Sequence, residues 1–239
     1  MDPDHNPMNS ASARDKARAG AALRRSILFR SLPPAAIARL AAGSTALHFP
    51  RGAQLFRCGE RCAGLYTVVS GRVANSVGVT SGPNKVVDLT GPGGHVGLAS
   101  VVLGANHIVT AEALTDSALL LTPQTTLFEC GSAVAELWPQ LAAALSRQVC
   151  ALVADVAAFS LNSGRERVAH YLLAMTTTQG SRQCPVTLPA KKSIIASRLN
   201  LTPEYFSRML HELIAAGTIA VNGRHITVLD PARLRVPPH

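Results

Sequence analysis

Residues 191–229 read KKSIIASRLNLTPEYFSRMLHELIAAGTIAVNGRHITVL, and this stretch decides how the chain is interpreted. Apolar residues recur at helical spacing from Ile194 to Leu199, and Asn200 interrupts the pattern, which predicts a first helix. Thr202 then offers a side-chain oxygen to free amides. Pro203 suits the first position of a second helix, because its missing N–H is not needed there. The sequence therefore predicts two helices joined by a short turn.

The second predicted helix has an apolar face and a polar face. Its apolar face consists of Phe206, Met209, Leu210 and Leu213. Its polar face consists of Glu204, Ser207, Arg208 and His211. A stripe that combines an acceptor, a hydroxyl and a guanidinium can read the edges of bases in the major groove of DNA. We therefore interpret this helix as a recognition helix, with Lys191, Lys192 and Arg224 expected to meet phosphates.

Two β-prone runs follow this helix. Gly217 ends the helical pattern, and residues 218–221 and 225–229 form the runs. They are joined by Asn222–Gly223, which is a signal for a type I′ hairpin turn. The whole stretch is thus predicted to be a winged helix-turn-helix.

This stretch resembles the DNA-binding domain of the CRP/FNR transcription regulators. The matching segments are residues 195–199, 202–210, 217–219 and 223–226. The resemblance implies double-stranded DNA and RNA polymerase as partners, and no enzymatic activity. The alternative is a helical hairpin with no role in DNA binding, since a motif alone is a hypothesis until its structural context is known.

The polar stripe also suggests a DNA sequence. Glu204, Ser207 and Arg208 resemble the Glu-x-x-Ser-Arg pattern of the FNR branch, which implies a palindrome close to TTGAT-N4-ATCAA. Pro203 departs from the usual residue beside that glutamate, so contacts at the start of the helix are expected to differ from those of the branch.

Charge and composition fit a regulator of this kind. The chain has 239 residues and a formal net charge of +9. Residues 165–239 hold 10 Lys and Arg against 4 Asp and Glu, whereas residues 31–164 hold 7 of each. The basic surplus therefore lies mainly in the predicted DNA-binding domain, where it would neutralise phosphates. No apolar run approaches the roughly 20 residues that cross a membrane. No secretory leader is recognisable, and the five cysteines suit a reducing cytoplasm.

The predicted fold class is α+β, with an N-terminal β-roll of the cyclic-nucleotide-binding-like jelly-roll type, a long dimerisation helix and a C-terminal winged helix-turn-helix. Short β runs between glycines predict the roll, and residues 65–73 and 86–94 resemble its characteristic strands. The expected segments are a disordered tail at 1–22, the β-roll sensor domain at 23–131, the dimerisation helix at 132–162, and the DNA-binding domain at 163–239.

The long helix carries an a/d seam. It consists of Ala142, Leu145, Val149, Leu152, Val156 and Phe159. The segment resembles the dimerisation helix of the family and implies a parallel homodimer, with a hinge at residues 162–164. The alternative is a helix packed against its own domain, because so few heptads cannot distinguish the two arrangements.

The predicted effector pocket lacks the groups that hold a cyclic nucleotide. In the cyclic-nucleotide-binding branch of the family, a glutamate follows the glycine, whereas here Leu98 follows Gly97. That branch also has an Arg-Ser pair in the segment where this chain has Ile108, Val109 and Thr110. A buried phosphate needs a paired cation. We therefore expect an effector other than cyclic AMP, as in the FNR-like and denitrification-regulator branches. A cyclic-nucleotide-responsive regulator with a divergent pocket is the alternative.

Histidines and cysteines of the chain are the candidates for sensing the signal. The resemblance to the denitrification branch implies nitric oxide or redox sensing, with haem as a candidate cofactor. The candidate ligands are His48, His95, His107, His170, Cys58 and Cys62. No cysteine precedes Cys58, so an iron–sulfur cluster like that of FNR is not expected. A thiol redox protein using Cys58 and Cys62 is the second alternative, although the pair lacks Cys-x-x-Cys spacing.

Overall fold

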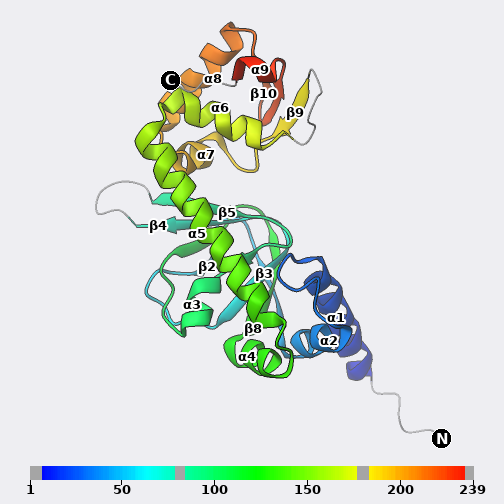
Figure 1. Cartoon of the computed structure of the whole chain (residues 1–239). Coiled ribbons are helices and arrows are strands. Elements are labelled where there is room, and N and C mark those ends of the chain that lie inside the picture. The colour runs from blue at the N-terminus through cyan, green and yellow to red at the C-terminus, as the bar shows by residue number, and fades with distance from the viewer. Residues whose placement is uncertain (1–6, 79–83, 177–182, 235–239) are drawn as a thin grey trace, which may run out of the picture. The chain divides into compact units, whose positions relative to one another are not determined.

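The computed structural model describes residues 7–78, 84–176 and 183–234. The chain divides into an N-terminal unit of residues 1–149 and a C-terminal unit of residues 150–239. Figure 1 shows that the first unit contains most of the strands and that the second is mainly helical. The predicted α+β class is confirmed.

Two four-stranded antiparallel sheets form the body of the N-terminal unit. One has the order β1-β8-β3-β6 and consists of β1 (Thr45–Phe49), β8 (Ser117–Pro123), β3 (Gly64–Ser70) and β6 (His95–Val96). The other has the order β2-β7-β4-β5 and consists of β2 (Gln54–Phe56), β7 (Thr110–Ala113), β4 (Val73–Val77) and β5 (Lys85–Thr90). Inward-facing residues of both sheets share one buried cluster, which includes Val68, Val73 and Ala111. The predicted roll is confirmed.

Helices pack beside the sheets and share a second core. They are α1 (Pro7–Arg25), α2 (Pro34–Gly43), α3 (Leu98–Leu103), α4 (Gln124–Ala133) and the start of α5 (Leu137–Leu161). Leu23, Leu40 and Leu127 are fully buried in this core, together with the start of α5 at Leu137. The N-terminal helices are thus part of the folded unit.

Helix α1 corrects the prediction of a disordered tail at residues 1–22. Ala19, Ala22 and Leu23 are buried against the core. The prediction failed because the buried stripe of α1 is narrow and made largely of alanine, so that it does not stand out between arginines. Residues 1–6 of the predicted tail lie outside the described residues.

The predicted helix over residues 132–162 also needs correction at its start. Helix α4 ends at Ala133, the backbone at Val134 is extended, and α5 begins only at Leu137. Pro139 explains the break, because proline is tolerated in the first turn of a helix but breaks a helix interior. The end of α5 at Leu161 agrees with the predicted hinge.

The C-terminal unit contains the predicted winged helix-turn-helix. Its elements after α5 are α6 (Gly164–Ala174), β9 (Cys184–Thr187), α7 (Lys192–Arg198), α8 (Pro203–Ala215), β10 (Ile219–Asn222), β11 (His225–Val228) and α9 (Pro231–Leu234). The three strands form a sheet of order β10-β11-β9. Phe206, Ile195 and Val168 are fully buried between the helices.

The turn of the wing differs from the expected type I′. Asn222 pairs with His225, so the two loop residues are Gly223 and Arg224. Gly223 has φ 62°, whereas Arg224 has no positive φ. Positive φ at the first loop position alone is the pattern of a type II′ turn, which also matches the twist of a hairpin.

Candidate nucleic-acid interface

Helix α8 turns its polar stripe outward. Phe206, Met209, Leu210 and Leu213 are buried, as predicted. On the opposite face Glu204, Arg208 and His211 are exposed and Ser207 is partly exposed. The four residues predicted to face DNA are therefore accessible on one helix.

The start of α8 is fixed by local chemistry. The Thr202 side-chain oxygen accepts a hydrogen bond of 3.2 Å from the Tyr205 amide, and Pro203 occupies the first helical position. Before the helix, Asn200 has φ 57°, which bends the chain between α7 and α8. Asparagine adopts this left-handed conformation more easily than most residues. These features set the angle at which α8 leaves the turn.

The cations of the interface have no acidic partners within the described residues. The two ion pairs found there join Arg198 to Asp155 and Arg233 to Asp230. The predicted phosphate-binding residues take no part in either pair; they are Lys191 and Arg224, which are exposed, and Lys192, which is partly exposed. Their charges are available to phosphates.

The junction between α5 and α6 lies in the same unit and is tightly bonded. Ser163 and Glu166 form a capping box at the start of α6. One Arg167 nitrogen donates to the carbonyl oxygens of Phe159 and Asn162 at 3.4 and 3.2 Å, and the other donates to that of Asn200 at 3.4 Å. Arg167 thus ties the end of α5 to the helix-turn-helix.

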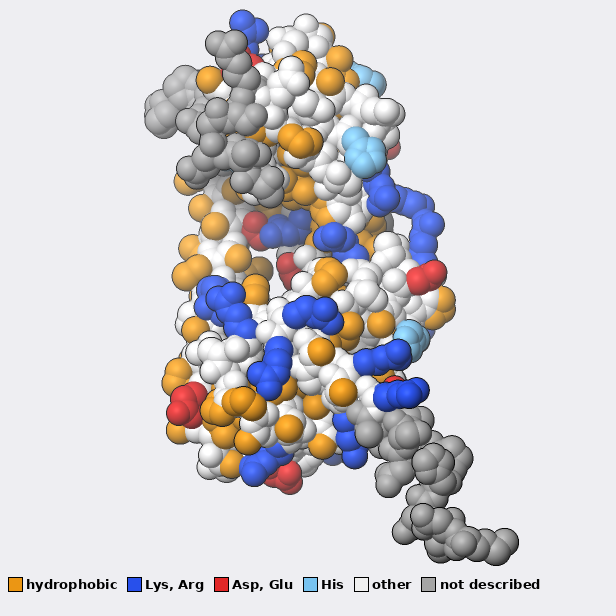
Figure 2. Space-filling model, turned by 90° about the vertical axis from the view of Figure 1, so that its right-hand side faces the viewer, with side chains coloured by type: hydrophobic (Ala, Val, Ile, Leu, Met, Phe, Trp, Pro, Cys, Tyr) orange, Lys and Arg blue, Asp and Glu red, His pale blue; other side chains and the backbone are white. Residues whose placement is uncertain are grey.

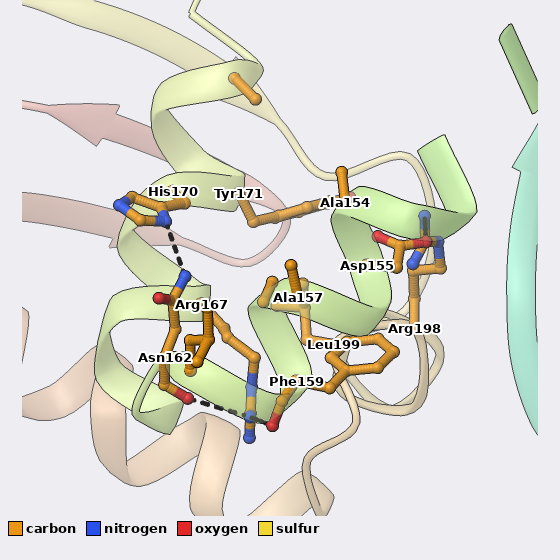
Figure 3. Close-up of a pocket in the computed structure, with 13 residues that line it drawn as sticks. Ala154, Asp155, Ala157, Phe159, Asn162, Arg167, His170, Tyr171, Arg198 and Leu199 are labelled. Carbon is orange, nitrogen blue, oxygen red and sulfur yellow. Dashed lines mark hydrogen bonds and ion pairs between the residues drawn. The ribbon is translucent and has the colours of Figure 1, made fainter. Parts of the chain in front are cut away.

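A cavity of about 580 Å³ lies between α5, α6 and α7 (Figure 3). Its lining is mostly apolar and includes Ala158, Phe159 and Leu199. The Arg198–Asp155 ion pair, at 2.7 Å, lies at one side. His170, a candidate metal ligand, is exposed and shares a 3.3 Å hydrogen bond with Asn162.

The residues of the predicted dimer seam differ in exposure. Val149, Leu152 and Val156 are 59%, 53% and 64% exposed, and Ala142 is exposed. Leu145 and Phe159 are partly buried in their own chain. Exposed Val153 also extends the apolar surface and was not part of the predicted seam.

Helix α5 has a further property that was not expected. Of the described residues, it alone forms a helix long and apolar enough to cross a membrane by length and composition. Leu137 and Leu141 at its start are buried, but most of its apolar side chains are not. The exposed apolar side chains of α5 therefore indicate a surface that another molecule covers.

The residues of the predicted effector pocket differ in conformation and burial. Gly97 caps α3 in a left-handed conformation, and Leu98 is buried in the core. Ile108 is 66% exposed, and Val109 packs partly against the inner cluster of the sheets. The Thr110 hydroxyl accepts a hydrogen bond of 3.1 Å from the Cys58 amide.

Sequence reasoning missed the arrangement of His107 beside this pocket. Its ring stacks on Phe56 with centroids 3.4 Å apart, and both of its nitrogens are buried without a partner in the described residues. Burial lowers the pKa of His107. Because His107 and Phe56 are distant in sequence, only the pairing of strands and loops brings them together.

The candidate metal ligands stay apart. Within residues 7–78, 84–176 and 183–234, no three His, Cys, Asp or Glu side chains are grouped to hold a metal ion. His48 is exposed on β1. His95 contacts Phe29 edge-on, and burial lowers its pKa to about 4. The candidate ligands therefore do not form a grouped metal site within the described residues.

Cys58 and Cys62 form no disulfide. Cys62 donates a weak hydrogen bond to the Gly64 carbonyl at 3.5 Å, and burial raises the pKa of its thiol. A raised pKa leaves less of the thiolate that thiol exchange requires. The geometry gives no support to a thiol redox centre.

Comparisons with known proteins agree with this architecture. Residues 166–236 match the Crp-like helix-turn-helix domain, and residues 46–132 match the cyclic nucleotide-binding domain. The fumarate and nitrate reduction regulatory protein of Vibrio cholerae is 25% identical over 187 residues, which are 77% of this chain and 74% of that protein.

Two further relatives extend the match. The CRP-like cAMP-activated global transcriptional regulator of Mycobacterium tuberculosis is 24% identical over 215 residues, which are 89% of this chain and 96% of that protein. The structure of FixK2 from Bradyrhizobium japonicum superposes with a TM-score of 0.71 at 25% identity, over 80% of this chain and 95% of that one.

The fold and the exposed stripe of α8 define a DNA-binding protein that combines a helix-turn-helix with a cyclic-nucleotide-binding β domain. The chain belongs to the CRP/FNR family of transcription regulators, which bind DNA and are not enzymes.

Proposed function

We propose that this regulator acts as a homodimer that binds an FNR-like palindrome close to TTGAT-N4-ATCAA. The observation that carries the proposal is the stripe of Glu204, Ser207 and Arg208 on the accessible face of α8. An α-helix fits the major groove, and a two-fold dimer presents two such helices to the two halves of a palindrome.

Each residue of the stripe has a distinct task in this proposal. Arg208 donates two hydrogen bonds to guanine O6 and N7, Glu204 accepts one from a cytosine amino group, and Ser207 approaches a thymine edge. His211 continues the stripe toward the end of the helix. Lys191, Lys192 and Arg224 neutralise phosphates, which raises affinity for all sequences alike.

A second copy of the chain covers α5 in this proposal. The exposed Val149, Leu152 and Val156 follow the a/d pattern, and members of the family are typically dimers. A dimer seam accounts for the apolar surface of α5 without a membrane. The family further supports a place in the cytoplasm and RNA polymerase as a partner.

The controlling signal is not cyclic AMP in this proposal. Leu98 is buried in the core, and Ile108 and Val109 supply no cation for a phosphate. The alternative, a cyclic-nucleotide regulator with a divergent pocket, draws support from the cAMP-activated relative of Mycobacterium tuberculosis.

The proposed function is tested by selecting binding sites from random duplexes with the wild type, Arg208→Ala and Arg224→Ala. We expect the palindrome for the wild type. Arg208→Ala should lose about 1–3 kcal/mol per half-site and relax the preference at the guanine. Arg224→Ala should weaken all sequences alike and reduce the salt dependence of binding. An unrelated, non-palindromic site, or an unchanged guanine preference in Arg208→Ala, would refute the assignment.

A further inference from the structure

The ring of Tyr205 lies against the backbone of Gly164. A Cβ atom added to Gly164 would lie 2.8 Å from Cζ and 2.9 Å from the hydroxyl oxygen of Tyr205. Gly164 is the first residue of α6 and belongs to the hinge that follows α5. Its backbone does not have the positive φ that would itself require glycine. The space taken by the Tyr205 ring is therefore the local reason for a residue without a side chain at this position.

The same ring also supports Arg208. The Arg208 guanidinium lies over the Tyr205 ring, 4.7 Å from its centroid. The two residues are three apart on α8, where side chains share a face. A cation over an aromatic ring is held there by the electrostatics of the ring. Tyr205 thus restricts the long side chain of Arg208 before DNA is bound.

We propose that Tyr205 is a positioning residue, which holds the Arg208 guanidinium in the orientation that reads guanine. Because the same ring packs against Gly164, the orientation of Arg208 depends on the backbone of the hinge. The inference rests on the proposed role of Arg208 in reading bases. A change in the hinge backbone at Gly164 moves the seat of the Tyr205 ring, and the guanidinium that rests on the ring shifts with it. The hinge thereby acts on base selectivity as well as on affinity.

The simpler alternative is that Tyr205 only stabilises the packing of α6 on α8. Its ring is partly exposed, whereas Phe206 beside it is fully buried and is the core residue of this turn of the helix. A packing role predicts a loss of stability without a change in base preference. The two roles are therefore separated by the ratio of affinities for two DNA sequences.

The test compares binding to the selected palindrome with binding to the same duplex after the guanine of each half-site has been replaced by adenine. Tyr205→Phe keeps the ring and should keep the wild-type ratio. Tyr205→Leu removes the ring and should lower the ratio by about two- to fivefold per half-site, the range expected for a cation over an exposed ring. Far-UV circular dichroism and a thermal melt of each variant establish that it is folded.

Gly164→Ala supplies a second and independent route. In the wild-type background the new methyl group displaces the Tyr205 ring, so the ratio should again fall. In the Tyr205→Leu background the obstacle is gone, and the same substitution should leave the ratio unchanged. Such non-additivity is the signature of coupled residues. If Tyr205→Leu proves unstable, Tyr205→Met can serve as the ring-free background in which the non-additivity is measured.

The outcomes distinguish this inference from the proposed function. If Arg208→Ala leaves the guanine preference unchanged, Arg208 does not read guanine, and both proposals fall. If Arg208→Ala relaxes the preference while folded Tyr205→Leu and Gly164→Ala keep the wild-type ratio, Tyr205 has a packing role only and the inference alone is wrong.

Discussion

The carboxylate of Asp155 lies 2.7 Å from the guanidinium of Arg198, so an ion pair joins α5 to the first helix of the helix-turn-helix. Both side chains are partly screened from water, at 20% exposure for Arg198 and 26% for Asp155. Breaking the pair with Asp155→Asn or Arg198→Gln should lower the free energy of unfolding by about 1 kcal/mol. The double variant should cost less than the sum of the two single variants. Urea denaturation of all four proteins measures this coupling, and strict additivity would show that the pair contributes nothing.

Leu152→Asp should dissociate the dimer. Leu152 is 53% exposed in the single chain, and a two-fold seam would bury the introduced carboxylate twice without a partner. Sedimentation should show a monomer, and specific DNA binding should be lost with it. Ala151→Asp places the same charge on the neighbouring exposed residue outside the seam, and it should remain dimeric. A dimeric Leu152→Asp protein would mean that the seam lies elsewhere.

Stability should fall as the pH decreases from about 6.5 toward 4, and His95 should account for part of the loss. Burial lowers the pKa of His95 from 6.5 to about 4, so in this range the unfolded chain binds a proton that the folded chain does not. Stability is therefore fully present above the unfolded pKa and is lost on acidification, by at most about 3 kcal/mol. His107 contributes with the same sign, because its pKa is also lowered.

His95→Gln removes this titration while retaining a polar group beside Thr67. The difference in melting temperature between pH 7.5 and pH 5 should be smaller for His95→Gln than for the wild type. Equal differences would show that His95 titrates normally in the folded protein.

Thr202→Ala should destabilise the C-terminal unit by about 1 kcal/mol, because the Tyr205 amide loses its side-chain acceptor. Thr202→Ser keeps the oxygen and serves as the matched control. Chemical denaturation measures both, and the cap would be unimportant if alanine and serine behaved alike.

Cyclic AMP should not bind at micromolar concentration. The residues where a phosphate partner is expected, Ile108 and Val109, are apolar, and a buried phosphate without a cation is costly. Isothermal titration calorimetry of the dimer should give no heat of binding. Micromolar affinity together with tighter DNA binding would favour the cyclic-nucleotide alternative.

The helix-turn-helix was predictable from sequence because its determinants are local. Thr202, Pro203 and the apolar spacing that begins at Phe206 act within a few residues of one another. Helix α1 was not predictable in the same way, because alanines such as Ala19 become a buried face only when α2 is present. Composition alone made that segment look unstructured.

The candidate sites also differ in whether their residues are close together or far apart in sequence. The exposed stripe of α8 follows from one helical period. The stacking of His107 on Phe56 and the seat of Tyr205 on Gly164 each join segments that are far apart in sequence. No spacing rule connects such residues, and only the folded chain reveals them.

The count of charges along the sequence assigns the surplus of basic residues mainly to the DNA-binding domain, but a second group of basic residues lies near the N-terminus. Exposed cations also lie on α1 and α2 and in the turn between them; they are Arg14, Lys16, Arg18, Arg24, Arg25, Arg30 and Arg39. The one carboxylate between residues 14 and 43 is that of Asp15. Figure 2 shows this face of the N-terminal unit, where Lys and Arg side chains predominate over acidic ones. The charge count by sequence segment began at residue 31, so it separated Arg39 from the six cations that precede residue 31.

The capping box at Ser163 makes α6 self-sufficient at its start. The Glu166 amide is bonded by the Ser163 hydroxyl, and the Ser163 amide by the Glu166 carboxylate, so these two amides need no acceptor from α5. The chain can therefore be recombined here. A chimaera joined at Ser163, with the sensor of one relative and the DNA reader of another, keeps both halves of the cap on the reader's side. The last turns of α5 then have to supply only the partners of Arg167 and Arg198, which are the carbonyl oxygens of residues 159 and 162 and the carboxylate of residue 155.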